Sequence, residues 1–321
     1  MYFSLIPLVE QVKRMKSNIF VLILMLFITS CASLTKTQIE TVNQFAQTTK
    51  NFSAFPSKIM TGLADIRTMR GIYAANSIGT PEFHLKELDN AYNLKVIDYQ
   101  QSQMVDITFQ IIDQYAQSLI LLSADQYITD IKAQALITGP ALDSLIALYN
   151  RFDKNSKIKV GIGDAVSQLT IMGGKQYIRQ KQAKEIKKFI SQADPLISVM
   201  TANLLEFLEG KRVLATGDTA SLKDLIDYEA KALPRDYLSF LRQNKATIEN
   251  EKEYLKLKND MDQVRNLQVQ TIVATRALRE AHRQLSEILK TKKKLKERFT
   301  ELQELYEDVN QLKTTIVKLK F

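Results

Sequence analysis

The only cysteine of the chain, Cys31, is the residue whose position points most directly to a chemistry. It follows the ten consecutive apolar residues Ile19–Ile28 and two small residues. A secretory signal peptide has a basic start, an apolar stretch of about 7–15 residues and small residues before its cleavage site, and Lys16 supplies the basic start. Ten apolar residues are too few for a transmembrane helix, which needs about 20. The segment therefore predicts a signal peptide over residues 1–30, with Cys31 as the first mature residue.

Two alternatives bear on this N-terminus. Translation that begins at Met15 would give a more compact signal peptide, and residues 1–14 would then be an upstream extension. A cytosolic protein whose first helix is merely hydrophobic would instead keep Cys31 as a buried thiol. The lack of a second cysteine in 321 residues favours export, because such a chain forms no disulfides and risks no mispairing.

The residues Ile28-Thr29-Ser30-Cys31 resemble the lipobox of bacterial lipoproteins, in which an aliphatic residue and small residues precede a cysteine that becomes lipidated. The resemblance covers only the first thirty or so residues. It implies cleavage before Cys31 and acyl chains on that residue, which would attach the protein to a membrane. By analogy with Gram-negative sorting, Ala32 and Ser33 carry no Asp retention signal, so the outer membrane is favoured over the inner one.

Residues for catalysis or metal binding are scarce. The two histidines, His84 and His282, each follow a glutamate by two positions, which places the pair on different helix faces rather than in the Glu-x-x-His spacing of di-iron bundles. We expect both histidines on the surface. The Gly161-Ile-Gly163 sequence lacks the third small residue of a dinucleotide loop, and no phosphate loop or nucleophile elbow is present. The sequence predicts no enzyme, no cofactor and no metal site.

Two basic segments, Lys175–Lys188 and Lys290–Arg298, stand out in a chain of net charge +9. Basic amphipathic helices bind anionic membranes or polyanions. The alternative is a solvated face that nearby acids such as Glu301 and Glu304 neutralise. The candidate contacts with an anionic surface are Lys175, Arg179, Lys187, Lys188, Lys292, Lys293 and Lys294. Nucleic acid is not expected as a partner outside the cytoplasm.

The elements that must position these residues are long helices. Only ten Gly and six Pro occur, and Trp is absent, which indicates an all-α, elongated helical bundle over residues 31–233. Capping spacings predict helix starts at Thr37, Thr80 and Ser221. The helix after Thr80 is expected to run to about residue 137 and to end before Gly139-Pro140.

The strongest pattern lies in residues 234–321, where Pro234 is expected to open one long helix. A heptad register of sixteen positions from Val264 to Ile316 contains thirteen apolar residues. This 3–4 spacing is typical of a coiled-coil seam. An unbroken helix of this length would measure about 130 Å. We expect it to pack mainly on the chain's own bundle, with a further role in binding a protein partner or a second copy.

These features favour a lipid-anchored, non-enzymatic helical protein of the cell envelope that acts as a structural or protein-interaction module. The alternative function is a membrane-acting helical protein of the pore-forming or membrane-bending type. Residues 158–174 would then be the inserting segment, because they are mildly apolar and contain Gly173-Gly174 inside a helical pattern.

Overall fold

The computed structural model describes residues 34–53, 57–77, 79–124, 129–152, 158–168, 175–210, 212–213, 219–290 and 300–318. The described chain is all-α, as predicted, except for two strands of two residues each that pair antiparallel. The elements are α2 (Lys36–Ser53), α3 (Ser57–Ala75), α4 (Pro81–Leu122), α5 (Thr129–Phe152), α6 (Asp164–Ser167), α7 (Lys175–Glu209), β1 (Arg212–Val213), β2 (Thr219–Ala220), α8 (Leu222–Gln243), α9 (Ile248–Lys290) and α10 (Thr300–Lys318).

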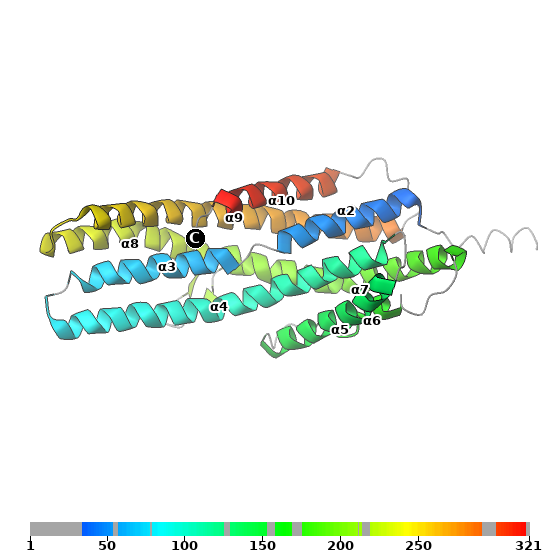
Figure 1. The fold of residues 1–321 in the computed structure, drawn as a ribbon, viewed down its shortest axis with the longest axis horizontal. Coiled ribbons are helices and arrows are strands. Elements are labelled where there is room, and N and C mark those ends of the chain that lie inside the picture. The colour runs from blue at the N-terminus through cyan, green and yellow to red at the C-terminus, as the bar shows by residue number, and fades with distance from the viewer. Residues whose placement is uncertain are drawn as a thin grey trace, which may run out of the picture.

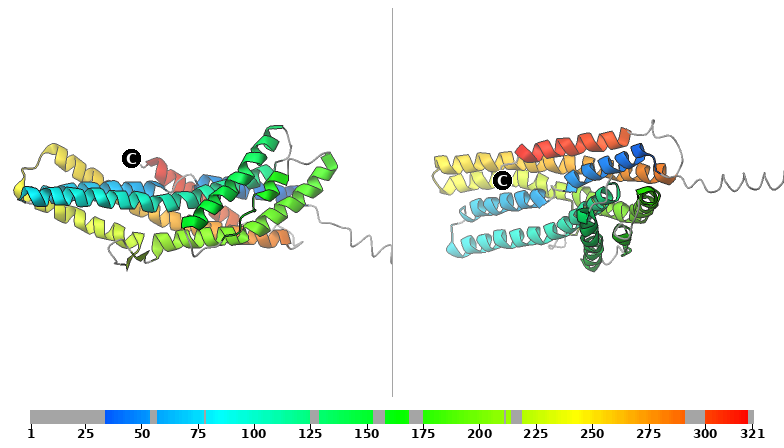
Figure 2. Two further views of the ribbon diagram at one scale, coloured as in Figure 1. Left: turned by 90° about the horizontal axis from the view of Figure 1, so that it is seen from below. Right: turned by 45° about the vertical axis from the view of Figure 1, so that its right-hand side comes forward.

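The molecule is an elongated bundle built on two long helices, α4 and α9, that run along most of its length (Figures 1 and 2). With 42 and 43 residues, each measures about 63 Å at 1.5 Å per residue. Each long helix is preceded by two shorter helices that lie end to end antiparallel to it. Helices α2 and α3 cover α4 in this way, and α7 and α8 cover α9.

The contacts of the first unit step regularly along α4. Phe52 packs on Phe109 with ring centroids 5.3 Å apart, and Arg67 binds Asp98. Further along, Gly71 lies so close to α4 that an added Cβ would stand 2.5 Å from the Cβ of Ala91. As the residue numbers increase along α2 and α3, the numbers of their partners on α4 decrease. This is the contact pattern of an antiparallel hairpin.

The two turns at one end of the bundle are tied together. The side chain of Gln243 donates a hydrogen bond to the carbonyl of Ser77, and that of Asn244 donates to the carbonyl of Asn76 at 2.8 Å. We call this end, which holds the α3–α4 and α8–α9 turns, the distal end. The proximal end is the opposite one, where α2, α7 and α10 begin and α4 and α9 finish (Figure 1).

The predicted seam is buried along α9. All its positions from 264 to 288 are at most 9% exposed, from Val264 and Leu267 at 0% to Ile288 at 8%. Helix α9 packs against α3, α7, α8 and α10, so the chain itself covers this apolar face. In α10 the register is only partly kept: the predicted position Val309 is buried, but Tyr306 is 56% exposed, and Leu305 and Leu312, each one position before a predicted one, are buried instead. The shift is possible because α10 is a separate helix that folds back along α9 and α2.

The prediction of one long helix from Pro234 is wrong. Pro234 lies inside α8, which continues to Gln243, and α9 begins only at Ile248. Burial of the residues around Pro234, such as Leu233 and Tyr237, offsets the hydrogen bond that proline removes. The helix break lies instead between α8 and α9. The start of α9 is capped there by Thr247, whose hydroxyl accepts a hydrogen bond from the backbone N–H of Asn250 at 3.2 Å.

Some of the other predicted helix boundaries are correct and others are wrong. Ser221 forms a capping box with Asp224, and Thr80 is the N-cap of α4 with proline after it. Helix α2 is capped by Thr35 and Gln38 instead of by Thr37. The helix after Thr80 ends at Leu122 rather than near residue 137, and Pro140 lies within α5 instead of breaking it.

The close approach of α3 and α4 leads to a first prediction. Gly71→Val should lower the free energy of unfolding by about 1–3 kcal/mol, because the new side chain overlaps Ala91 and forces the two helices apart. Urea denaturation followed by circular dichroism measures the change. The matched control is Gly79→Val, where an added Cβ meets nothing within 4 Å and the expected change is within about 0.5 kcal/mol. Equal effects of the two substitutions would contradict the overlap.

Candidate functional site

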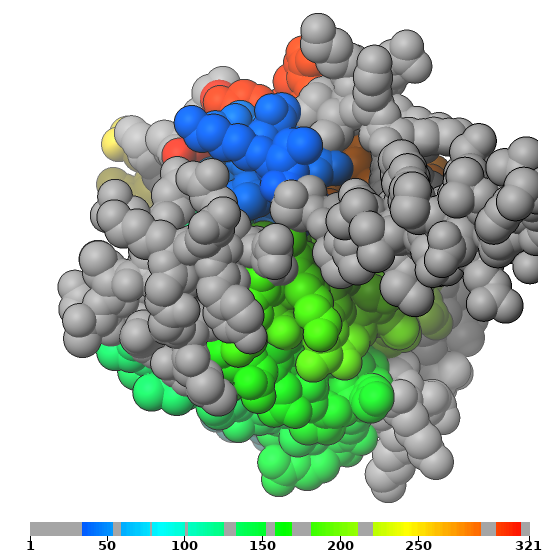
Figure 3. All heavy atoms as spheres, turned by 90° about the vertical axis from the view of Figure 1, so that its right-hand side faces the viewer, coloured from blue at the N-terminus to red at the C-terminus, as the bar shows by residue number. Residues whose placement is uncertain are grey.

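The proximal end gathers segments that are far apart in the sequence. Gln182 in the early part of α7 donates to the carbonyls of Leu122 and Ala124 at 2.9 and 3.0 Å, which ties α7 to the end of α4. Asn43 in α2 donates to the hydroxyl of Ser123 at 3.0 Å. Figure 3 looks onto this end, with the blue start of α2 above green residues that include α7. The beginning of the described chain therefore lies at the same end as the first basic segment.

The chain enters the bundle without a spacer. Leu34, the first described residue, is 8% exposed and belongs to the hydrophobic core. The next residue, Thr35, caps α2 through Gln38, with hydrogen bonds of 2.8 and 3.2 Å in the two directions. Cys31 lies outside the described residues, but three peptide units span at most about 11 Å. The first described residue therefore lies at the proximal end, within that length of chain from Cys31.

The basic residue candidates fall into three groups. Lys187 is half-buried and makes an electrostatic or polar contact, and Lys188 is exposed. Lys175 and Arg179 belong to α7, but the structure does not describe their side chains. Lys292, Lys293 and Lys294 lie outside the described residues, in the segment that joins the end of α9 to the start of α10. Both ends of that segment are at the proximal end (Figure 1).

The basic segment of α7 is amphipathic. Ile186, Phe189 and Ile190 are at most 1% exposed, whereas Lys184 and Lys188, one helical turn apart, point to solvent. Within the described residues, neither of these two lysines has a carboxylate partner, so the α10 acids do not neutralise them directly. Lys184 was not among the candidate contacts, although its spacing from Lys188 could have identified it.

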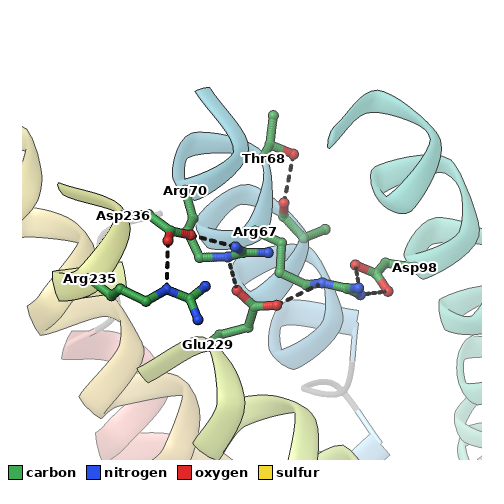
Figure 4. Close-up of polar contacts among 8 residues, drawn as sticks. Arg67, Thr68, Arg70, Asp98, Glu229, Arg235 and Asp236 are labelled. Atoms are coloured by element: carbon green, nitrogen blue, oxygen red, sulfur yellow. Dashed lines mark hydrogen bonds and ion pairs between the residues drawn. The ribbon is translucent and has the colours of Figure 1, made fainter. Parts of the chain in front are cut away.

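A buried network of charges connects α3, α4 and α8 (Figure 4). Arg67 contacts Asp98 at 2.5 Å and Glu229 at 3.2 Å, and Arg70 contacts Glu229 at 2.5 Å and Asp236 at 2.6 Å. The exposed fraction of these side chains is 13% or less, and that of Glu229 is 1%. Burial raises the pKa of Asp98, although Arg67 opposes the shift. Because each carboxylate faces an arginine and none is left for a substrate, the geometry favours a role in fixing helix positions.

A second polar cluster surrounds His282, and the prediction that this histidine lies on the surface is wrong. This residue is 2% exposed, because it lies beside the buried seam positions 278, 281 and 285. Its ring packs against Tyr115, with centroids 5.6 Å apart, and its Nδ1 lies 3.3 Å from Asp194. Burial, and secondarily Asp194, raises the pKa of Tyr115 well above its ordinary value. The other histidine, His84, is half-buried, with its Nδ1 2.9 Å from the carbonyl of Ala75.

A cavity of about 440 Å³ beside His282 also contains Asp194 and Ser198. These are the residue types of a nucleophilic triad, in which the serine must hydrogen-bond to the imidazole. The Nε2 of His282 is buried without any hydrogen-bond partner, and its Nδ1 faces Asp194, so Ser198 is not paired with the ring. The arrangement therefore does not form a nucleophilic triad.

The described residues offer neither a metal site nor a membrane-spanning helix. The described residues contain no group of three or more His, Cys, Asp or Glu side chains that could hold a metal ion. Nor is any described helix both long enough and apolar enough to cross a membrane.

The fold and the proximal end together define an elongated all-α protein whose described chain begins beside a basic helix. Comparisons with protein-family models, with curated proteins and with solved structures found no match to this chain. The function must therefore be inferred from the residues themselves.

Proposed function

We propose that this chain is a lipid-anchored, non-enzymatic protein of the bacterial cell envelope that serves as a structural or protein-interaction module. The attachment is made by acyl chains on Cys31. The observation that carries the proposal is the burial of Leu34 at the proximal end, three residues after that cysteine. An anchor at Cys31 holds a rigid helical body against the membrane instead of trailing it on a flexible linker.

The charge distribution supports this orientation. The basic helix α7 begins at the proximal end, and the segment with Lys292–Lys294 joins helices that meet there. Each basic residue near an anionic leaflet contributes about 1 kcal/mol. Lys184 and Lys188 project without carboxylate partners from the part of α7 near this end. These residues add a second, electrostatic attraction to the same membrane surface.

The distal end is the natural site for a protein partner. It stands about 60 Å from the anchor, given the length of α9. Large apolar side chains are exposed around its turns, with Phe83 57%, Leu85 61% and Ile248 65% exposed. Exposed large apolar side chains at one end of a molecule can supply the apolar part of an interaction surface. The buried seam of α9 is already occupied by the chain's own helices, so we place the partner contact here and not on the seam.

The membrane-acting alternative has less support. In the described part of the proposed inserting segment, Val160 is 46% exposed, but the other apolar residues are at most 8% exposed and belong to the core, namely Ile158, Ile162, Ala165 and Val166. Insertion would require α6 to leave its contacts with α5 and α7. Leakage of dye from anionic vesicles on addition of the acyl-free protein would favour this alternative over a passive anchor.

The experiment that tests the proposal is mass spectrometry of the mature N-terminal peptide from the protein expressed in a Gram-negative bacterium. We expect the first residue to be Cys31, with a mass increase that corresponds to acyl chains. A density gradient should place the protein in the outer-membrane fraction. An N-terminal peptide that contains residues before 31, or a Cys31 thiol that remains free for alkylation, would refute lipidation.

A further inference from the structure

A groove of about 540 Å³ lies between α2 and α10, and its lining is unusual for this chain. One quarter of the residues in the sequence are charged, yet none of the described residues that line the groove is charged. Five amides, one hydroxyl, one tyrosine and one leucine form its surface. They are Asn43, Gln44, Gln47, Thr48 and Asn51 from α2, with Leu302, Gln303 and Tyr306 from α10.

The amides of α2 are available to a ligand. Gln44, Gln47 and Asn51 are exposed and make no hydrogen bond to another described residue. Thr48 is 5% exposed, and its hydroxyl also lacks a partner among the described residues. An amide presents both donors and an acceptor, so this face can bind groups that both donate and accept hydrogen bonds.

The α10 side supplies the apolar part of the groove. The ring of Tyr306 is 56% exposed beside the half-buried Leu302. The ring therefore offers a flat surface next to the row of amides. A volume of about 540 Å³ falls within the 300–1,000 Å³ range of small-ligand sites. A few polar groups with one aromatic surface are sufficient for orientation and specificity.

We propose that this groove binds an uncharged oligosaccharide. Sugar hydroxyls donate and accept hydrogen bonds as the amides do, and the C–H face of a pyranose ring matches the exposed ring of Tyr306. An anionic ligand would find no counter-charge among the described lining residues, and the neighbouring Glu304 and Glu307 on α10, both exposed, would repel it. The inference does not rest on lipidation, since every residue that it uses belongs to the described bundle.

Isothermal titration calorimetry of the purified full chain with chitotetraose and with maltotetraose tests the proposal. We expect saturable binding of at least one of these neutral sugars. Tyr306→Ala should weaken the affinity at least about tenfold, and Tyr306→Phe should retain it, because the ring makes the contact. The double variant Gln44→Ala, Gln47→Ala should weaken it by a similar factor. Circular dichroism melting curves establish that each variant is folded.

The matched control is Tyr92→Ala on α4, which removes an equally exposed tyrosine, 65% exposed, outside the groove. This variant should bind as the unmodified chain does. Three results would overturn the proposal: no heat of binding at millimolar sugar, binding that Tyr306→Ala leaves unchanged, or equal losses in Tyr306→Ala and Tyr92→Ala. Binding of an uncharged helical peptide in place of both sugars would assign the groove to a protein partner and would also overturn it.

Discussion

Substitution of Glu229 by leucine is expected to lower the free energy of unfolding by about 3–5 kcal/mol, because it leaves two arginines in the interior without their shared carboxylate. Glu229 is 1% exposed and bridges Arg67 and Arg70. Arg67 keeps Asp98 and Arg70 keeps Asp236, but the Nε of each guanidinium loses the carboxylate that it faces and stays buried without a partner, which is costly. Urea denaturation followed by circular dichroism should show an earlier midpoint with the same slope.

Two comparisons separate this effect from simple loss of packing. Asp98→Asn should cost much less, since Arg67 keeps Glu229 and the asparagine no longer carries a buried charge whose pKa burial has already raised. Replacement of Arg67, Arg70, Asp98, Glu229 and Asp236 by apolar residues of similar size should recover most of the stability, because the only charge left without its partner is the exposed Arg235. If Glu229→Leu is neutral, the network is solvated in solution and does not fix the three helices.

The periodic features of the fold could be predicted from the sequence. The seam from Val264 to Ile288 is buried because a 3–4 spacing marks one helix face, whichever neighbour covers it. The helix ends are less predictable, because proline usually marks a helix boundary. Pro140 and Pro234, which the sequence places at such boundaries, lie inside helices, where tertiary packing outweighs the missing hydrogen bond.

The polar sites were predicted less well than the helices. Arg67 and Glu229 are 162 positions apart in the sequence, and no local pattern relates them. The burial of His282 could have been predicted, because its place next to seam positions 281 and 285 puts it on the buried face of α9. The amides of α2 also follow helical spacing, but their groove exists only because α10 folds back, which the prediction of one continuous helix did not allow.

Cys31→Ser is expected to move the protein from the membrane fraction to the soluble fraction. Stable anchoring requires two attractive contributions, and each buried CH₂ of an acyl chain supplies about 0.8 kcal/mol. Without the chains, only the basic residues remain, at about 1 kcal/mol each near an anionic surface. The exposed pair Lys184 and Lys188 would then give weak binding to anionic vesicles that salt abolishes. Fractionation of cells in low and high salt measures both effects.

The controls for this variant concern the signal peptide and the location of charge. Mass spectrometry of the N-terminus shows whether residues 1–30 remain, and a second variant with an ordinary cleavable signal peptide before Leu34 removes that uncertainty.

In the Cys31→Ser background, Lys184→Gln with Lys188→Gln should abolish the residual vesicle binding. The same change at Lys252 and Lys256, an exposed pair of equal spacing towards the distal end, should not. If Cys31→Ser stays in the membrane fraction at high salt after its signal peptide is removed, a contact other than the lipid holds the protein there. The proximal end would then have to bind the bilayer or a membrane protein through its own surface.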